Sequence, residues 1–161
     1  EHAEPGLVDL CAPDCVPPEY FSIVTAYDYS GGEVALVHAD HPQLRRMAVF
    51  DAIVNNADRK GGHILAGADG GVYGVDHGVS LHTQNKLRTV LWGWAGDRID
   101  ERVLADLLGL DDKLTGPLGT QLREHITVAE ISALRRRIRA LLDEATMPVP
   151  ENHRPLPWPA F

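Results

Sequence analysis

Hydrophobic and polar residues follow two different periods in the first half of this chain. Over residues 20–39, β-branched, aromatic and aliphatic residues flank a glycine pair at residues 31–32, a pattern that predicts two strands joined by a tight turn. From His41 onward the apolar residues recur at helical spacing, and Asp40 with Pro42 predicts where that helix begins. The glycine-rich stretch that follows must end it.

Two further helices are predicted in the second half. A group of leucines marks the first, and Thr127 begins the second as an N-cap, with Glu130 completing a capping box. The apolar stripe of the second helix is interpreted as buried core rather than as a partner-binding face. The leucines are Leu104, Leu107, Leu108 and Leu110, and the stripe is Ile131, Leu134, Ile138, Leu141 and Leu142.

The remaining segments are short or rich in proline. The runs HIL and VYGVD lie on either side of an Asp69-Gly70 turn and predict a second hairpin, whereas LRTVLWGW predicts a packed loop or a short helix. Residues 1–19 contain several prolines and acidic residues, so no regular structure is expected there. The tail MPVPENHRPLPWPAF has five prolines and is expected to be extended, lying against the body through Trp158 and Phe161.

These elements together predict an α+β fold, mostly helical, with two small hairpins. The 161 residues suit about one domain, and the 44% hydrophobic content is typical of a globular protein. No apolar run approaches the roughly 20 residues that span a bilayer, and no signal-peptide pattern opens the sequence. We therefore expect a cytoplasmic protein without a transmembrane segment.

Charge and cysteine content narrow the function classes. A net charge of −8 argues against general nucleic-acid binding, which needs clustered Lys and Arg. The one arginine cluster, at residues 135–139, falls on a helix and is interpreted as a solvated face rather than an anion site. Cys11 and Cys15 have neither a second pair nor the spacing of a redox motif, so they are expected to be structural or incidental thiols.

Chemistry-bearing residues gather between Asn55 and Gly78. This stretch contains three Asp, two His, one Lys, one Arg and seven Gly in 24 residues. Asp58 precedes the predicted hairpin and Asp76 follows it, so the two carboxylates are expected to face one pocket. Paired carboxylates repel unless a cation lies between them, and oxygen ligands suit Mg²⁺ or Mn²⁺.

Lys60 and His63 lie on the same predicted loop as Asp58. A carboxylate that orients a hydroxyl, a lysine that neutralises a phosphoryl group and two metal-ligand candidates are the components of a phosphotransferase. A hydrolase and a plain binding module also remain open, because Asp and Gly are common turn residues and Asn55 with Asn56 can simply cap a helix.

The phrase FDAIVNNADRKGGHIL…VYGVDHG resembles the phosphatidylinositol 3-/4-kinase superfamily, in which a helix leads into D-R-H-x-x-N and a later strand ends in D-F-G. HipA-like protein kinases have a similar pattern. With LRTVLWGWAGD and PLPWPAF, the whole run is similar to actinobacterial proteins labelled phosphatidylinositol 3-/4-kinase-like. The likeness is strong over residues 44–97.

The resemblance implies a role for each candidate residue. Asp58 matches the catalytic Asp, Asp76 matches the metal-binding Asp of D-F-G, and Lys60 is expected to contact the ATP γ-phosphate. His63 stands where the family has a metal-binding Asn, and imidazole suits Mn²⁺ or Zn²⁺ better than Mg²⁺. Arg59 is expected to be structural, pairing with Asp51.

Kinases also need an N-terminal lobe with a phosphate-covering loop and a strand lysine, and no residue here fits that lysine. The expectation is therefore a kinase-like C-terminal lobe: residues 1–40 form a connector and hairpin leading from a missing N-lobe, and residues 41–161 form the helical C-lobe. Its catalytic loop covers residues 55–63 and its metal-binding strand end residues 75–78.

The expected reaction transfers the ATP γ-phosphate to a hydroxyl of a lipid, protein or small molecule. The alternative is a pseudokinase or nucleotide-binding regulatory module without turnover.

Overall fold

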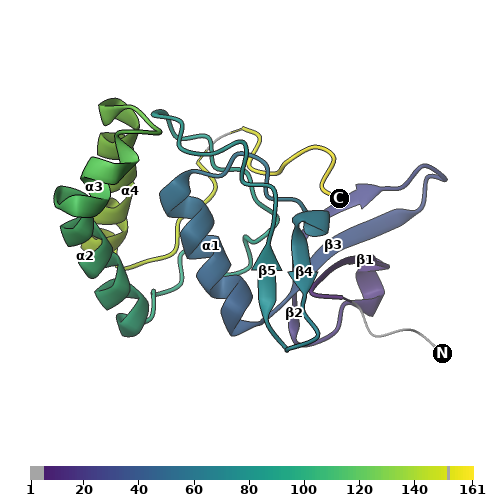
Figure 1. The fold of residues 1–161 in the computed structure, drawn as a ribbon. Helices are drawn as coiled ribbons and strands as arrows, with labels where there is room; N and C mark the ends of the chain where they lie inside the picture. Colours follow the sequence, from purple (N-terminus) through teal and green to yellow (C-terminus); the bar gives the residue numbers. More distant parts are fainter. Residues whose placement is uncertain (1–5, 152) are drawn as a thin grey trace.

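The fold is α+β, with a small antiparallel sheet and a hairpin on one side of helix α1 and a helical layer on the other (Figure 1). The computed structural model describes residues 6–151 and 153–161. Its elements in chain order are β1 (Val8–Cys11), a 3-10 turn (Pro13–Cys15), β2 (Tyr20–Tyr27), β3 (Glu33–Ala39), α1 (Pro42–Val54), a 3-10 turn (Gly61–His63), β4 (Ile64–Ala66), β5 (Val72–Gly74), α2 (Glu101–Thr115), α3 (Pro117–Leu122) and α4 (Val128–Glu144).

The first sheet has three strands in the order β1-β3-β2, all antiparallel. The predicted pair at residues 20–39 is confirmed as β2 and β3, and Gly31 adopts a left-handed φ of 84° in the turn between them. The expectation that residues 1–19 lack regular structure is wrong at β1. Its Val8 lies opposite His38 and its Cys11 opposite Ala35, so pairing with the buried central strand decides its conformation.

Helix α1 begins and ends at identifiable residues. His41, rather than Asp40, is the N-cap: its Nδ1 accepts a hydrogen bond from the Gln43 amide, and Pro42 follows at the first helical position. Asp40 instead accepts a hydrogen bond from Trp94 Nε1. The helix ends at Asn55, whose φ of 57° is the left-handed conformation of a C-terminal cap, so it stops six residues before Gly61.

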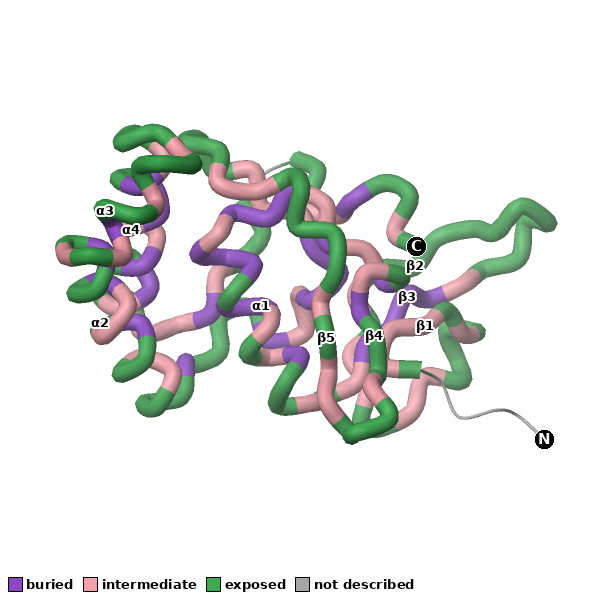
Figure 2. The backbone as a smooth tube through the Cα atoms, in the orientation of Figure 1, coloured by how far each residue is buried: buried purple, intermediate pink, exposed green. Residues whose placement is uncertain are grey.

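Helices α2 and α4 pack against each other, and α4 also packs against α1. The capping box of Thr127 and Glu130 is present, and the predicted stripe of α4 is confirmed as core, apart from Leu142, which is only partly buried. Helix α3 was not predicted, because a six-residue helix with two glycine or proline positions gives almost no periodic signal. Figure 2 shows buried residues along α1 and α4, whereas the residues of the turn between β2 and β3 are exposed.

The arginines of α4 are not simply a solvated face. Asp111 of α2 accepts hydrogen bonds from Arg135 at 2.7 Å and from Arg139 at 3.1 Å, and these arginines, Arg135 foremost, lower the pKa of the Asp111 carboxyl. Arg137 donates from Nε to the Ile53 carbonyl at the end of α1. Burial lowers the Arg137 pKa to about 10. These arginines therefore join α4 to its neighbouring helices.

The segment LRTVLWGW is a packed loop, with Val90, Leu91 and Trp94 buried. The tail lies against the body, as predicted, although its described residues bend several times: the Pro155 carbonyl accepts hydrogen bonds from Trp92 Nε1 and the Thr89 amide. Trp158 is not its anchor, because that side chain is 91% exposed. Within the described residues, no helix is long and apolar enough to cross a membrane.

Candidate active site

The loop after α1 is built on a buried ion pair. The guanidinium of Arg59 donates from Nη2 to Asp51 Oδ1 at 2.9 Å, and neither side chain is exposed. This confirms the predicted pairing. Arg59 Nη1 also donates to the carbonyls of His63 and Val75, at 3.3 and 2.9 Å. One side chain therefore ties together the helix, the loop and the chain that leaves β5.

Two asparagines fix the backbone around this pair. Asn55 donates from Nδ2 to the carbonyls of His82 and Gln84 and accepts from the Lys86 amide, so it holds the following loop as well as capping α1. Asn56 donates to Asp51 and accepts, through Oδ1, a 3.0 Å hydrogen bond from the Asp58 amide. Asp58 is thereby placed at the loop surface by buried polar groups.

The predicted catalytic pair Asp58 and Lys60 lie in contact. Lys60 Nζ is 3.4 Å from Asp58 Oδ2, and both side chains are partly exposed. Asp58 therefore has an ammonium group as its neighbour.

Asp76 follows the hairpin but is not at the end of its strand. The turn at Asp69-Gly70 is confirmed, yet β5 ends at Gly74, and Asp76 adopts a left-handed φ of 53°. A non-glycine residue with this φ is uncommon outside turns and functional sites. The turned backbone leaves the Asp76 carboxylate 61% exposed and 3.6 Å from His63 Nε2.

His63 links the two aspartates. Its Nδ1 is 3.0 Å from the Asp58 carbonyl, which can only accept, so Nδ1 carries a proton and donates. In the neutral ring, Nε2 then presents a lone pair toward the Asp76 carboxylate. A cation can bind between two such acceptors. Ligands at about 2.1 Å from one ion are separated by roughly 3 Å or more, so the pair suits two ligands of a single metal.

The protein side chains alone do not form a complete metal site. Among residues 6–151 and 153–161, no three His, Cys, Asp or Glu side chains gather as metal ligands. A Mg²⁺ or Mn²⁺ ion held by one or two protein ligands takes its other ligands from water and phosphate oxygens. The His63–Asp76 pair therefore fits a metal that arrives with a phosphate ligand.

Two neighbouring features were missed from the sequence. Phe50 of α1 stacks edge-on against His77 at 5.4 Å, and both line an open groove of about 460 Å³ beside Asp76. The C-terminal residues reach the loop after α1: the Gly61 amide donates to the Ala160 carbonyl at 2.8 Å, and the Phe161 ring lies 2.6 Å from where a Gly61 Cβ would be. The aromatic tail residues signal docking, but no sequence pattern gives their position.

The chain is similar to Protein Rv2133c of Mycobacterium tuberculosis, with 60% identity over 157 residues that make up 98% of this chain. It spans 56% of the length of that protein. No protein-family model matches the sequence, and no solved structure is significantly similar to it.

Proposed function

We propose that this chain is the C-terminal lobe of an atypical kinase of the phosphatidylinositol 3-/4-kinase-like type, which transfers the ATP γ-phosphate to a hydroxyl group. The supporting observation is the unbroken series of contacts from Lys60 through Asp58 and His63 to Asp76. These are the four residues that the family resemblance assigns to phosphoryl transfer, and they come from two loops on either side of a hairpin.

Each residue has one task in this proposal. Asp58 orients the acceptor hydroxyl and takes its proton, and Lys60 turns from Asp58 toward the transferred phosphoryl group, whose negative charge it neutralises. Asp76 and His63 hold Mg²⁺ or Mn²⁺, which supplies charge neutralisation at the phosphate oxygens when bound. The adenine is held chiefly by an N-terminal lobe outside this chain.

A second candidate is a nucleotide-binding regulatory module without turnover. Two observations favour it: His63 replaces the expected asparagine, and Asp58 already has Lys60 as an ion-pair partner. That ion pair occupies the carboxylate that the first proposal turns toward the acceptor hydroxyl. Both candidates require metal-dependent nucleotide binding at Asp76.

The test measures ATP consumption and nucleotide binding by the full-length protein with Mg²⁺ or Mn²⁺. Asp58→Asn is compared with Asp143→Asn, an exposed carboxylate on α4 that serves as the matched control. We expect Asp58→Asn to lower kcat at least about 100-fold while nucleotide binding persists, and Asp143→Asn to change neither.

Equal ATP consumption by wild type and Asp58→Asn contradicts phosphotransfer at this site. Nucleotide binding without consumption in the wild type supports the regulatory module. Binding that is unchanged in Asp76→Asn overturns both candidates, because each places the metal on that carboxylate.

A further inference from the structure

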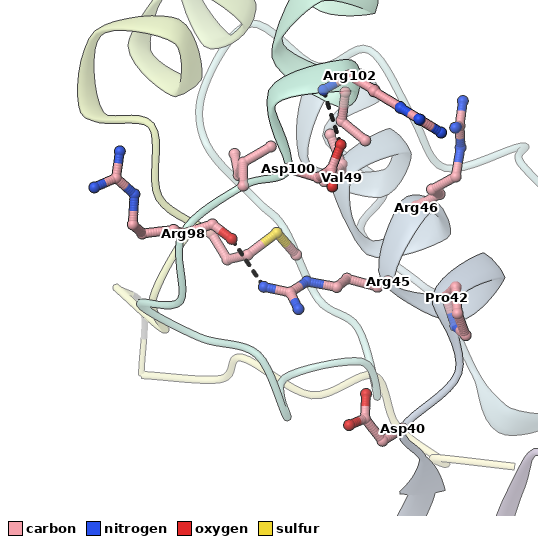
Figure 3. Close-up of a pocket in the computed structure, with 11 residues that line it drawn as sticks. Asp40, Pro42, Arg45, Arg46, Val49, Arg98, Asp100 and Arg102 are labelled. Carbon is pink, nitrogen blue, oxygen red and sulfur yellow. Dashed lines mark hydrogen bonds between the residues drawn. The ribbon is translucent and has the colours of Figure 1, made fainter.

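We propose that an arginine-lined cavity between the start of α1 and the start of α2 binds a small polyanion that carries two or more phosphate or carboxylate groups. The cavity measures about 570 Å³ (Figure 3). Its charged lining residues are Arg45, Arg46, Arg98, Arg102, Asp40 and Asp100. The lining itself therefore contributes four arginines and two aspartates.

Both lining carboxylates are engaged by other groups of the protein. Asp40 accepts a hydrogen bond from Trp94 Nε1 at 2.9 Å, and Asp100 caps α2 by accepting from the Arg102 amide at 2.8 Å. In Figure 3, Asp40 lies at the far end of the cavity from Arg46 and Arg102. The arginine-rich end is therefore not neutralised from within the cavity lining.

Two more carboxylates, which are not among the lining residues, form ion pairs with the arginines. Asp97 is 3.7 Å from Arg45, and Asp106 is 3.1 Å from Arg46. These pairs are exposed, with both Asp side chains more than half accessible, so each contributes little and is readily exchanged for a ligand anion.

Arg46 and Arg102 come from different helices and point toward one another. Like charges in this arrangement repel, and an anion between them removes the repulsion. Arg102 also stands in the first turn of the 15-residue helix α2, where the helix dipole favours negative charge. Guanidinium groups make bidentate hydrogen bonds with phosphates and carboxylates, which suits this pair to one anionic group.

Arg45 provides a second contact point. Its Nη2 donates to the Arg98 carbonyl at 2.8 Å, which fixes the guanidinium direction and leaves its other N–H groups for a ligand. The Arg98 side chain points away from the others in Figure 3, so it is not assigned to the site. Between these contacts, Val49, Ile99, Val103 and Met147 form an apolar wall. A compact ligand with at least two separated anionic groups fits this lining.

This cavity lies apart from Asp58 of the proposed phosphotransfer site. Arg45 and Arg46 lie in the first turn and a half of α1, whereas Asp58 follows its other end, and 13 helical residues extend about 20 Å. Arg46 also lines the groove that contains Phe50 and His77. The inference therefore does not depend on kinase activity.

The test is calorimetric titration of the full-length protein with inorganic tripolyphosphate and, separately, with citrate, in a metal-free buffer containing EDTA. The variant is Arg46→Gln with Arg102→Gln, and the matched control is Arg123→Gln, an exposed arginine after α3. We expect one binding site whose affinity falls at least about tenfold in the double variant and changes less than about twofold in the control.

Stronger binding of tripolyphosphate assigns the ligand to phosphate compounds, and stronger binding of citrate assigns it to polycarboxylates. Circular dichroism checks that the double variant folds, and Arg46→Lys with Arg102→Lys provides a version that keeps the charge. Absence of wild-type binding to both probes overturns the proposal, as does an equal loss in Arg123→Gln, which indicates nonspecific attraction. Tripolyphosphate binding that persists in Lys60→Gln separates this site from the phosphotransfer site, where Lys60 is the residue proposed to contact the phosphoryl group.

Discussion

The Asp51 carboxylate and the Arg59 guanidinium meet at 2.9 Å with both side chains fully buried, eight residues apart in the chain. This pair lies beneath the candidate catalytic loop, and the same guanidinium binds the carbonyls of His63 and Val75. A buried charge that loses its partner is strongly destabilising, because the remaining ion has neither water nor a counterion. The loop geometry therefore depends on this pair more than on the exposed ion pairs nearby.

We expect Arg59→Met to lower the free energy of unfolding by about 3–5 kcal/mol, because it leaves the Asp51 carboxylate buried and unpaired. Urea unfolding followed by circular dichroism measures the change, with exposed Arg123→Gln as a control that stays within about 0.5 kcal/mol of wild type. Arg59→Lys is also expected to destabilise, since a single ammonium cannot reach Asp51 and both carbonyls together. A loss below about 1 kcal/mol in Arg59→Met contradicts this account.

The buried His38 should make stability depend on pH. Burial lowers its pKa below the usual 6.5, although the Ala39 carbonyl and Asp40 partly offset this shift. Its Nε2 accepts a hydrogen bond from the Gly93 amide at 3.0 Å, so the folded state requires a neutral ring. Between pH 6.5 and the lowered pKa, the unfolded chain binds more protons than the folded one, and stability therefore falls as the pH decreases.

Urea unfolding at several pH values between 5 and 7.5 tests this dependence. We expect His38→Gln, whose amide can both donate and accept, to weaken the loss of stability below about pH 6.5, whereas exposed His125→Gln retains it. If the free energy of unfolding depends on pH with the same slope in wild type and His38→Gln, the pH dependence belongs to other groups.

Local sequence signals predict much of the fold, and they predict which residues lie close together in the candidate site. The capping box at Thr127 and the two hairpin turns depend on neighbouring residues, and the structure has them as predicted. The Arg59–Asp51 pair could also be predicted from the sequence, because a buried arginine after a helix needs an acidic partner nearby. Strand β1 and the left-handed conformation of Asp76 could not be predicted from the sequence. Pairing with a distant strand determines β1, and packing around the hairpin determines Asp76.

The contact between the C-terminal residues and Gly61 also depends on tertiary packing rather than on local sequence, and it has a measurable consequence. A Cβ at residue 61 would lie 2.6 Å from the Phe161 ring, so Gly61→Ala must displace the tail. We expect faster removal of Phe161 by carboxypeptidase in Gly61→Ala, together with a loss of about 1–3 kcal/mol in stability. The double variant Gly61→Ala/Phe161→Ala should recover part of that loss relative to the sum of the single changes. If the two losses of stability are strictly additive, residues 61 and 161 are not in contact.

The chemistry of His63 gives the sharpest test of the metal assignment. Its Nδ1 donates to the Asp58 carbonyl, which leaves Nε2 facing Asp76, and an imidazole ligand favours Mn²⁺ or Zn²⁺ over Mg²⁺. In His63→Asn, the amide nitrogen can still donate to that carbonyl while the amide oxygen provides a harder ligand. We therefore expect the ratio of Mg²⁺ to Mn²⁺ affinity, measured by calorimetry on the full-length protein with a nonhydrolysable ATP analogue, to rise at least about fivefold. His77→Asn is the matched control, because His77 stacks on Phe50 one residue beyond Asp76 and has no assigned metal contact. An unchanged ratio in His63→Asn, or an equal rise in both variants, would remove His63 from the metal site and leave Asp76 as its sole protein ligand in the proposal.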